Sequence, residues 1–162
     1  METNVNFKVK HIEPARKEGC VVVIVQFNGS SKEFTYVRKA YNNTTVIEGV
    51  DCCFHNSLYQ IDKDRVIVGG DNSFSIVNID KCIIEKRIEG ESLGGVYCFL
   101  KLRDNKTILC GCDNGKFCFY DMNTKQYKIT KNNHNDDIND LLLIDDNTFL
   151  CLSDITIKVW KY

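Results

Sequence analysis

The feature that most constrains the fold of this chain is an internal repeat. Three stretches share one pattern: an acidic or Asn turn, an apolar run, a second tight turn and an alternating run. They are IDKDRVIVGGDNSFSIVNI (61–79), LRDNKTILCGCDNGKFCFYD (102–121) and IDDNTFLCLSDITIKVWK (144–161). Val66, Ile108 and Phe149 open the first apolar runs and lie 42 and 41 residues apart. Because several features share this spacing, the chain is a tandem array of similar units.

The apolar runs have the length and composition of β-strands. A run of about 4–8 residues between turn signals predicts a strand, and a period of roughly 40–45 residues built from strands is typical of propeller blades. The chain has only one proline and is rich in Val, Ile, Phe, Tyr and Thr, which favours strands over helices. In chain order, the expected strands of the three clear units are Val50–Ile61, Val66–Gly70, Phe74–Ile79, Ile83–Ile88, Val96–Leu102, Ile108–Cys112, Lys116–Asp121, Tyr127–Thr130, Ile138–Ile144, Phe149–Ser153 and Thr156–Lys161.

A fourth, degenerate unit precedes these three. Cys20–Phe27, Lys32–Lys39 and Thr44–Glu48 match the second, third and outer strands of a unit. Asn4–Glu13 alternates polar and apolar residues and is also a strand. It has two possible places: the first strand of its own unit, or the missing outer strand of the last unit.

At these residues the chain resembles the WD-repeat family. The last unit carries the clearest match, since His134 falls at the family's histidine, Asp154 at its turn acid and Trp160 at its tryptophan. The middle unit keeps DNGKFCFYD, with Tyr120 and Asp121 at the Trp-Asp position. The resemblance implies that His134, Asp154 and Trp160 form a structural hydrogen-bond network within their blade.

The resemblance also implies the architecture. The expectation is an all-β, partial or small β-propeller of about four four-stranded antiparallel blades, forming a single domain over residues 1–162. Its degenerate blade covers 1–43, and the clearer repeats cover 44–88, 89–130 and 131–162.

About four blades leave the array open. Propellers have roughly four to eight blades, and an open arc exposes two apolar end faces. If each face exposes about 500 Å² of apolar surface, the two together lack roughly 25 kcal/mol of stabilisation from burial, as an upper bound. We therefore expect the ring to be completed by self-association or by a partner; a strained four-blade ring and a fragment of a longer protein are the alternatives.

The expected function is a non-enzymatic scaffold for protein–protein interaction within a larger assembly. Its partners are other proteins, including a second copy of itself, and neither a membrane nor a small-molecule substrate is expected. Loops at the rim of rigid sheets are the usual binding sites. The candidate rim contacts are Asp71, Asn72, Glu91, Asp113, Asn114, His134 and Asp136.

No catalytic, cofactor-binding or metal-binding residues are predicted. Cys52, Cys53 and His55 lie close in sequence, and Cys110 and Cys112 share one side of a strand, but the paired ligand spacing of zinc sites is missing. The acidic stretch around His134 lacks the ligand order of a calcium loop. A propeller enzyme stays a weaker alternative, because it needs convergent polar residues in a pocket.

A second alternative is an RNA- or ribonucleoprotein-associated factor. It would use the basic N-terminal residues Lys8, Lys10, His11, Arg16 and Lys17. The formal net charge of the whole chain is −1, so nucleic acid outside such a complex is not expected.

The cysteines indicate the compartment. Nine cysteines, an odd number, and a polar start at Met1–Lys10 without an apolar leader predict free thiols in a reducing compartment. The apolar run Val21–Val25 is too short to cross a bilayer. We expect a cytoplasmic protein, with the nucleus as the alternative.

Overall fold

The computed structural model describes the backbone of residues 7–14, 20–27, 33–39 and 43–47, and both backbone and side chains of Ile47, Val50, 57–130 and 134–162. These parts hold β-strands β1–β15 and one short 3₁₀ turn, η1 (Asp113–Gly115), and contain no α-helix. The all-β prediction is therefore confirmed over the described residues.

The strands form four antiparallel sheets, in which strands consecutive in the chain lie side by side. The first sheet holds β1 (Phe7–Pro14), β2 (Cys20–Phe27), β3 (Glu33–Lys39) and β4 (Asn43–Ile47). The second holds β5 (Leu58–Gln60), β6 (Arg65–Gly69), β7 (Ser73–Asn78) and β8 (Ile83–Glu89). The third holds β9 (Val96–Lys101), β10 (Thr107–Cys112), β11 (Phe117–Asp121) and β12 (Gln126–Ile129). The fourth has three strands: β13 (Ile138–Leu143), β14 (Thr148–Ser153) and β15 (Ile157–Lys161).

The place of the N-terminal strand is decided by its pairing. β1 pairs antiparallel with β2, from Phe7 opposite Phe27 to Pro14 opposite Val21. It is therefore the first strand of its own sheet and not an outer strand of the fourth. Among the described strands, β15 pairs with β14 alone, so the other edge of β15 is open.

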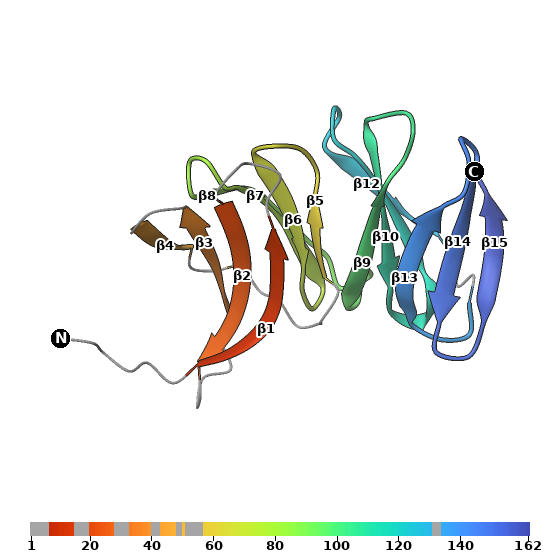
Figure 1. Ribbon diagram of the computed structural model, residues 1–162. Helices are drawn as coiled ribbons and strands as arrows, with labels where there is room; N and C mark the ends of the chain where they lie inside the picture. The colour runs from red at the N-terminus through yellow and green to blue at the C-terminus, as the bar shows by residue number, and fades with distance from the viewer. Residues whose placement is uncertain are drawn as a thin grey trace.

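The four sheets follow one another along an arc, with β1–β4 at one end of it and β13–β15 at the other (Figure 1). The first strands lie against each other from sheet to sheet, since β9 contacts both β5 and β13. Each sheet thus stacks its face on the next sheet instead of sharing a strand with it.

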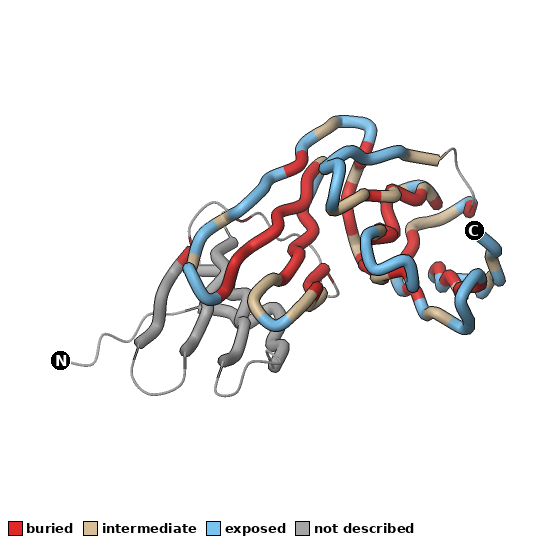
Figure 2. Tube along the Cα trace, turned by 90° about the horizontal axis from the view of Figure 1, so that it is seen from above, coloured by how far each residue is buried: buried red, intermediate tan, exposed pale blue. Residues whose placement is uncertain are grey.

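Apolar side chains fill the spaces between the sheets. Between the first and second sheets, Ile47 and Val50 belong to a buried cluster with Val66, Val68 and Val77. A second cluster joins the second and third sheets, and a third joins the third and fourth. Figure 2 shows that the buried stretches run along the strands, whereas the turns and the strands β8 and β12 are largely exposed. Because β6 and β7 bury nearly every residue, both faces of the second sheet are covered.

Aromatic contacts repeat at the sheet-to-sheet junctions. Phe74 of β7 meets Tyr120 of the third sheet edge to face, with ring centroids 5.4 Å apart. Phe117 of β11 meets Trp160 of the fourth sheet in the same way at 5.6 Å, and also contacts Phe149 at 5.4 Å. Edge-to-face pairs at this distance stabilise beyond the area that they bury. An aromatic residue near the start of β7 and of β11 therefore packs against the following sheet.

We predict that Phe117→Ala lowers the free energy of unfolding by about 3–5 kcal/mol, because it empties a buried site and removes two aromatic contacts. Urea unfolding followed by the fluorescence of Trp160, the single tryptophan, measures this at one fixed protein concentration. Lys86→Ala, on the exposed strand β8, is the matched control and should change stability by no more than about 0.5 kcal/mol. Equal losses in the two variants would contradict the packing described.

Candidate interaction surfaces

The first candidate surface is the turn rim, formed by the β6–β7, β10–β11 and β14–β15 turns and by residues 90–95 and 134–137. Asn72 and Asn114 occupy corresponding places in two of these turns, and both have the left-handed backbone conformation, with φ of 52° and 54°. Asn is the residue other than Gly that best tolerates this region. Local turn chemistry therefore explains why both units carry an Asp-Asn pair.

Backbone hydrogen bonds tie the rim together. The N–H of Asn72 donates to the carbonyl of Gly94 at 3.0 Å, and the N–H of Gly90 donates to the carbonyl of Asn72 at 2.9 Å. The loop Gly90–Gly95 thus runs along the turn of its own sheet before it enters the next. The rim is a fixed surface and not a set of independent loops.

Two rim carboxylates are already engaged inside the protein. Asp113 accepts a hydrogen bond from the N–H of Gly95 at 2.6 Å. Asp137 accepts one from the N–H of Asn114 at 2.9 Å and another from the hydroxyl of Tyr97 at 3.0 Å. Burial and these nearby carboxylates raise the pKa of Tyr97, so its phenol stays protonated. Through Asp137, the segment that leads into the fourth sheet is hydrogen-bonded to the third.

The predicted rim contacts therefore divide into two groups. Asp71, Glu91 and Asn114 are exposed and accessible to a partner. Asn72, Asp113 and Asp136 are partly buried, and Asp136 accepts a hydrogen bond from the N–H of Asp137 at 2.9 Å. His134 is buried, with 2% of its surface exposed, so it is a packing residue and not a contact.

The predicted network of His134, Asp154 and Trp160 is corrected by the geometry. His134 and Trp160 do lie together, with ring centroids 6.3 Å apart. Asp154, however, is exposed at the tip of its turn and accepts a hydrogen bond from the side-chain amide of Asn139. The turn after Ser153 is one residue shorter than the turn after Cys112, and the hydrogen-bond partner of His134 Nδ1 is Thr156 instead of Asp154.

A hydroxyl takes the place of that carboxylate. Nδ1 of His134 lies 3.2 Å from the Thr156 hydroxyl, which in turn lies 3.0 Å from the Ser153 hydroxyl. Ser153 and Thr156 were not among the predicted site residues, although hydroxyl residues on both sides of an Asp in a tight turn often form local hydrogen bonds. Nε2 of His134 and Nε1 of Trp160 are buried and have no hydrogen-bond partner in the described part of the chain.

The cysteines support the buried-strand interpretation. Cys98, Cys110, Cys112 and Cys118 are buried, and the first three thiols have pKa values raised by burial. Burial also raises the pKa of Cys151 to about 12. Protonated thiols are poor nucleophiles and poor metal ligands. No group of three or more His, Cys, Asp or Glu within the described ranges is placed to hold a metal ion.

Some predictions fall outside the described part. The side chains of Cys52, Cys53 and His55 belong to this group, as do the basic residues Lys8, Lys10, His11, Arg16 and Lys17. Over the residues that are described, no helix has the length and apolar character needed to span a bilayer.

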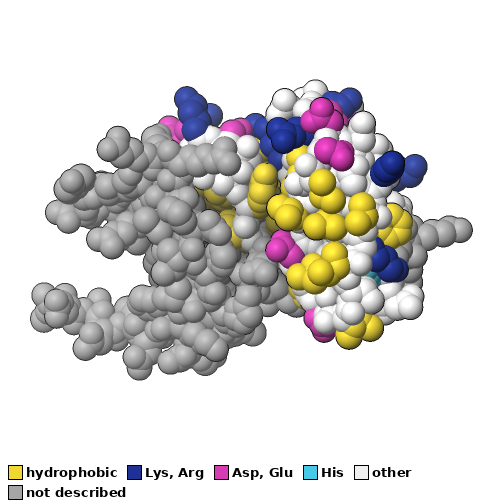
Figure 3. Space-filling model, turned by 45° about the vertical axis from the view of Figure 1, so that its right-hand side comes forward, with side chains coloured by type: hydrophobic (Ala, Val, Ile, Leu, Met, Phe, Trp, Pro, Cys, Tyr) yellow, Lys and Arg dark blue, Asp and Glu magenta, His cyan; other side chains and the backbone are white. Residues whose placement is uncertain are grey.

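The second candidate surface is the outward face of the fourth sheet, here called the open face: Leu142, Leu150, Leu152, Ile157 and Val159. Cross-strand pairing places them in two rows, because Leu142 and Val159 flank Leu150, and Asp140 and Ile157 flank Leu152. Leu142 and Val159 are each 62% exposed, and Ile157 is 67% exposed. Figure 3 shows apolar side chains gathered on this side of the molecule.

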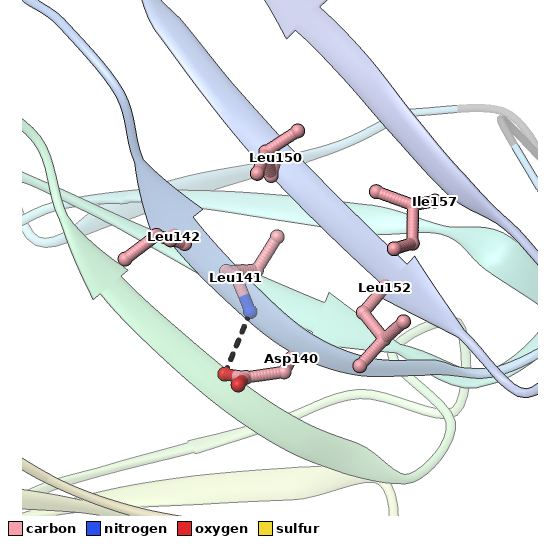
Figure 4. Close-up of a pocket in the computed structure, with 6 residues that line it drawn as sticks. All are labelled: Asp140, Leu141, Leu142, Leu150, Leu152 and Ile157. Carbon is pink, nitrogen blue, oxygen red and sulfur yellow. Dashed lines mark hydrogen bonds between the residues drawn. The ribbon is translucent and has the colours of Figure 1, made fainter.

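A shallow groove of about 170 Å³ crosses the open face. Its lining is Asp140, Leu141, Leu142, Leu150, Leu152 and Ile157 (Figure 4). Asp140 stands at one end and accepts a hydrogen bond from the N–H of Leu141 at 2.8 Å. The groove is otherwise aliphatic, so it suits apolar side chains and offers no set of groups for chemistry.

We predict that acid destabilises the protein partly through His134. Burial and the charge of Lys158 lower the pKa of His134 below its ordinary 6.5, so the unfolded chain binds a proton more readily than the folded one. The free energy of unfolding should therefore fall as the pH drops through 6.5. Urea unfolding across this range should show a shallower pH dependence for His134→Gln than for the unaltered protein. Identical slopes would contradict this assignment.

We also predict that alkylation distinguishes the thiols. Under native conditions iodoacetamide should modify Cys82, which is half-buried, well before the five buried cysteines of the described part, whose thiols become reactive only on unfolding. Peptide mass spectrometry of each site, with and without urea, measures the difference. Native modification of Cys110 at the rate of Cys82 would rule out the packing of β10.

No family model matches the chain, and no curated protein matches it. Solved structures do share its fold. The crystal structure of the computationally designed Ika4 protein matches with a TM-score of 0.70 and 16% identity, over 95% of this chain and 91% of that chain. A chain in the crystal structure of the mitotic checkpoint complex matches with a TM-score of 0.72 and 14% identity, over 99% of this chain and 51% of that chain. The present chain thus spans about half of the latter, and both likenesses concern the fold alone.

Proposed function

We propose that this chain is a non-enzymatic protein–protein interaction module of the WD-repeat kind. It is a partial β-propeller of four blades, and it serves as a scaffold subunit of a larger assembly in the cytoplasm or nucleus. The four stacked sheets support the blade interpretation, since β9 lies against both β5 and β13 and the aromatic contact of Phe74 with Tyr120 recurs as Phe117 with Trp160.

The observation that carries this proposal is the open face. Water reaches most of the surface of Leu142, Ile157 and Val159, although they stand together on a rigid sheet. A contiguous apolar patch of several hundred Å² on a soluble protein marks a site of association. The face therefore requires a protein partner to be stable in water.

The turn rim supports the same role. Asp71, Glu91 and Asn114 are exposed on turns whose backbones are hydrogen-bonded to their neighbours. A rigid rim with projecting polar side chains loses little conformational entropy on binding. The rim would bind polar groups of a partner, while the open face would bind apolar side chains.

The chemistry of the described side chains favours binding over catalysis. The buried thiols are held protonated, and the imidazole of His134 packs between Trp160 and Thr156. One of the similar solved chains belongs to the mitotic checkpoint complex. This supports a role in an assembly and leaves the partner to be found by experiment.

The test is the state of the purified chain in solution. Light scattering should give a mass above the 18.6 kDa of one chain, or else the monomer should bind the dye 8-anilinonaphthalene-1-sulfonate through the open face. Leu142→Ser should reduce the association or the dye binding, since it makes the face more polar. A dispersed, stable monomer that binds no dye would contradict the proposal.

A further inference from the structure

The residue pairs of the open face have counterparts at the internal sheet junctions, and the comparison indicates which kind of contact the face can make. The β6–β7 pair of Ile67 with Ile76 corresponds to Leu109 with Phe119 in the third sheet and to Leu150 with Val159 in the fourth. Ile67 and Leu109 are fully buried because the next sheet covers them. In the fourth sheet the same position faces solvent.

One position breaks this correspondence. Opposite Phe74, Phe117 and Ile157, the second strands carry Gly69, Gly111 and Leu152 respectively. Both glycines are required by the following sheet. A Cβ on Gly111 would lie 2.5 Å from Cγ2 of Ile138, and one on Gly69 would collide with the carbonyl of Val96.

Leu152 therefore excludes a following sheet at the internal spacing. At Gly69 and Gly111 the first residue of the following sheet, Val96 or Ile138, lies where a side chain would stand. Leu152 carries a large side chain at the corresponding position of the fourth sheet. This holds for any sheet of this kind, whichever chain supplies it. The open face is thus not one more blade junction awaiting the next blade.

Five large aliphatic residues without a glycine suit face-to-face packing at a wider spacing than that of the internal junctions. Sheets in sandwiches lie about 10 Å apart and interdigitate such side chains. Leu150 stands at the centre of the open face, with Leu142 and Val159 on either side of it. Leu152 lines the groove (Figure 4), so one surface carries both a projecting side chain and a depression.

The charges make this surface complementary to itself. Asp140 lies at one corner of the face beside Leu152, and Lys161 lies at the opposite corner, on β15; both are exposed. When two such faces cross at about a right angle around a twofold axis, each Asp140 comes close to the Lys161 of the other copy. A two-fold contact of this kind uses one surface twice.

We propose that a second copy of this chain covers the open face, so that two fourth sheets pack against each other in an isologous dimer. The inference rests on the proposed function, because it names the partner of one of its surfaces. Two faces of about 500 Å² bury about 1,000 Å², which is the lower limit for a specific interface. The dimer is therefore weak, with a dissociation constant on the order of micromolar.

The test uses Leu150 at the centre of the face, which lies near the twofold axis when the two faces are centred on each other. Sedimentation equilibrium of the full chain should show a concentration-dependent dimer. Leu150→Lys and Leu150→Glu should each weaken it at least about tenfold, and an equimolar mixture of the two variants should restore it, because the opposite charges meet. Ile83→Lys, which alters an apolar residue 47% exposed on β8, should leave it unchanged. Circular dichroism checks folding, and Ile157→Lys, at a position 67% exposed, replaces the pair if the Leu150 variants do not fold.

The outcomes separate the two proposals. A dimer that survives both Leu150→Lys and Ile157→Lys overturns the open-face contact but leaves the interaction module intact. A dimer that is lost in the single variants and not restored by mixing shows that the face meets a different surface, which also overturns the isologous contact. A monomer that binds no dye overturns both proposals. Loss with restoration supports both.

Discussion

The structure depends on the burial of each sheet's apolar face by the sheet that follows. No sheet here is large enough to be stable alone, because a few short strands with one or both faces wet gain too little from burial. Phe74 and Phe117 show how the stack is secured: each projects from one sheet into the next and meets an aromatic ring there. The stability of each sheet therefore depends on its neighbours, and the sheets at the ends of the array each have one face that no neighbouring sheet among the described strands covers.

Close approach at the turn rim follows from the same stacking. Gly69 and Gly111 let the first residue of the next sheet come near, and at the junction of the third and fourth sheets the carboxylate of Asp137 accepts a hydrogen bond from the N–H of Asn114. The rim is rigid for this reason. The proposed scaffold role would combine the rigid rim and the uncovered sheet face.

Sequence patterns located the strands but not every register. The turn between Gly69 and Phe74 is one residue shorter than the turn between Gly111 and Phe117, so the spacing of 42 residues that relates Val66 to Ile108 does not hold beyond this turn, and pairing aligns Val77 with Tyr120. A slip of one residue reverses the face on which a side chain lies. Asp154 was misassigned for a related reason, since turn geometry and not sequence position decides where its carboxylate points.

The sequence by itself determined the repeat, the all-β class and the approximate bounds of the strands, because alternation, turn residues and a fixed period are local properties of the chain. Only the tertiary structure decided which faces are covered. It placed β1 in its own sheet, gave Thr156 the contact with His134, and showed that Leu152 stands where two other sheets need glycine. These features depend on distances between segments far apart in the chain, and such distances exist only once the sheets have packed against each other.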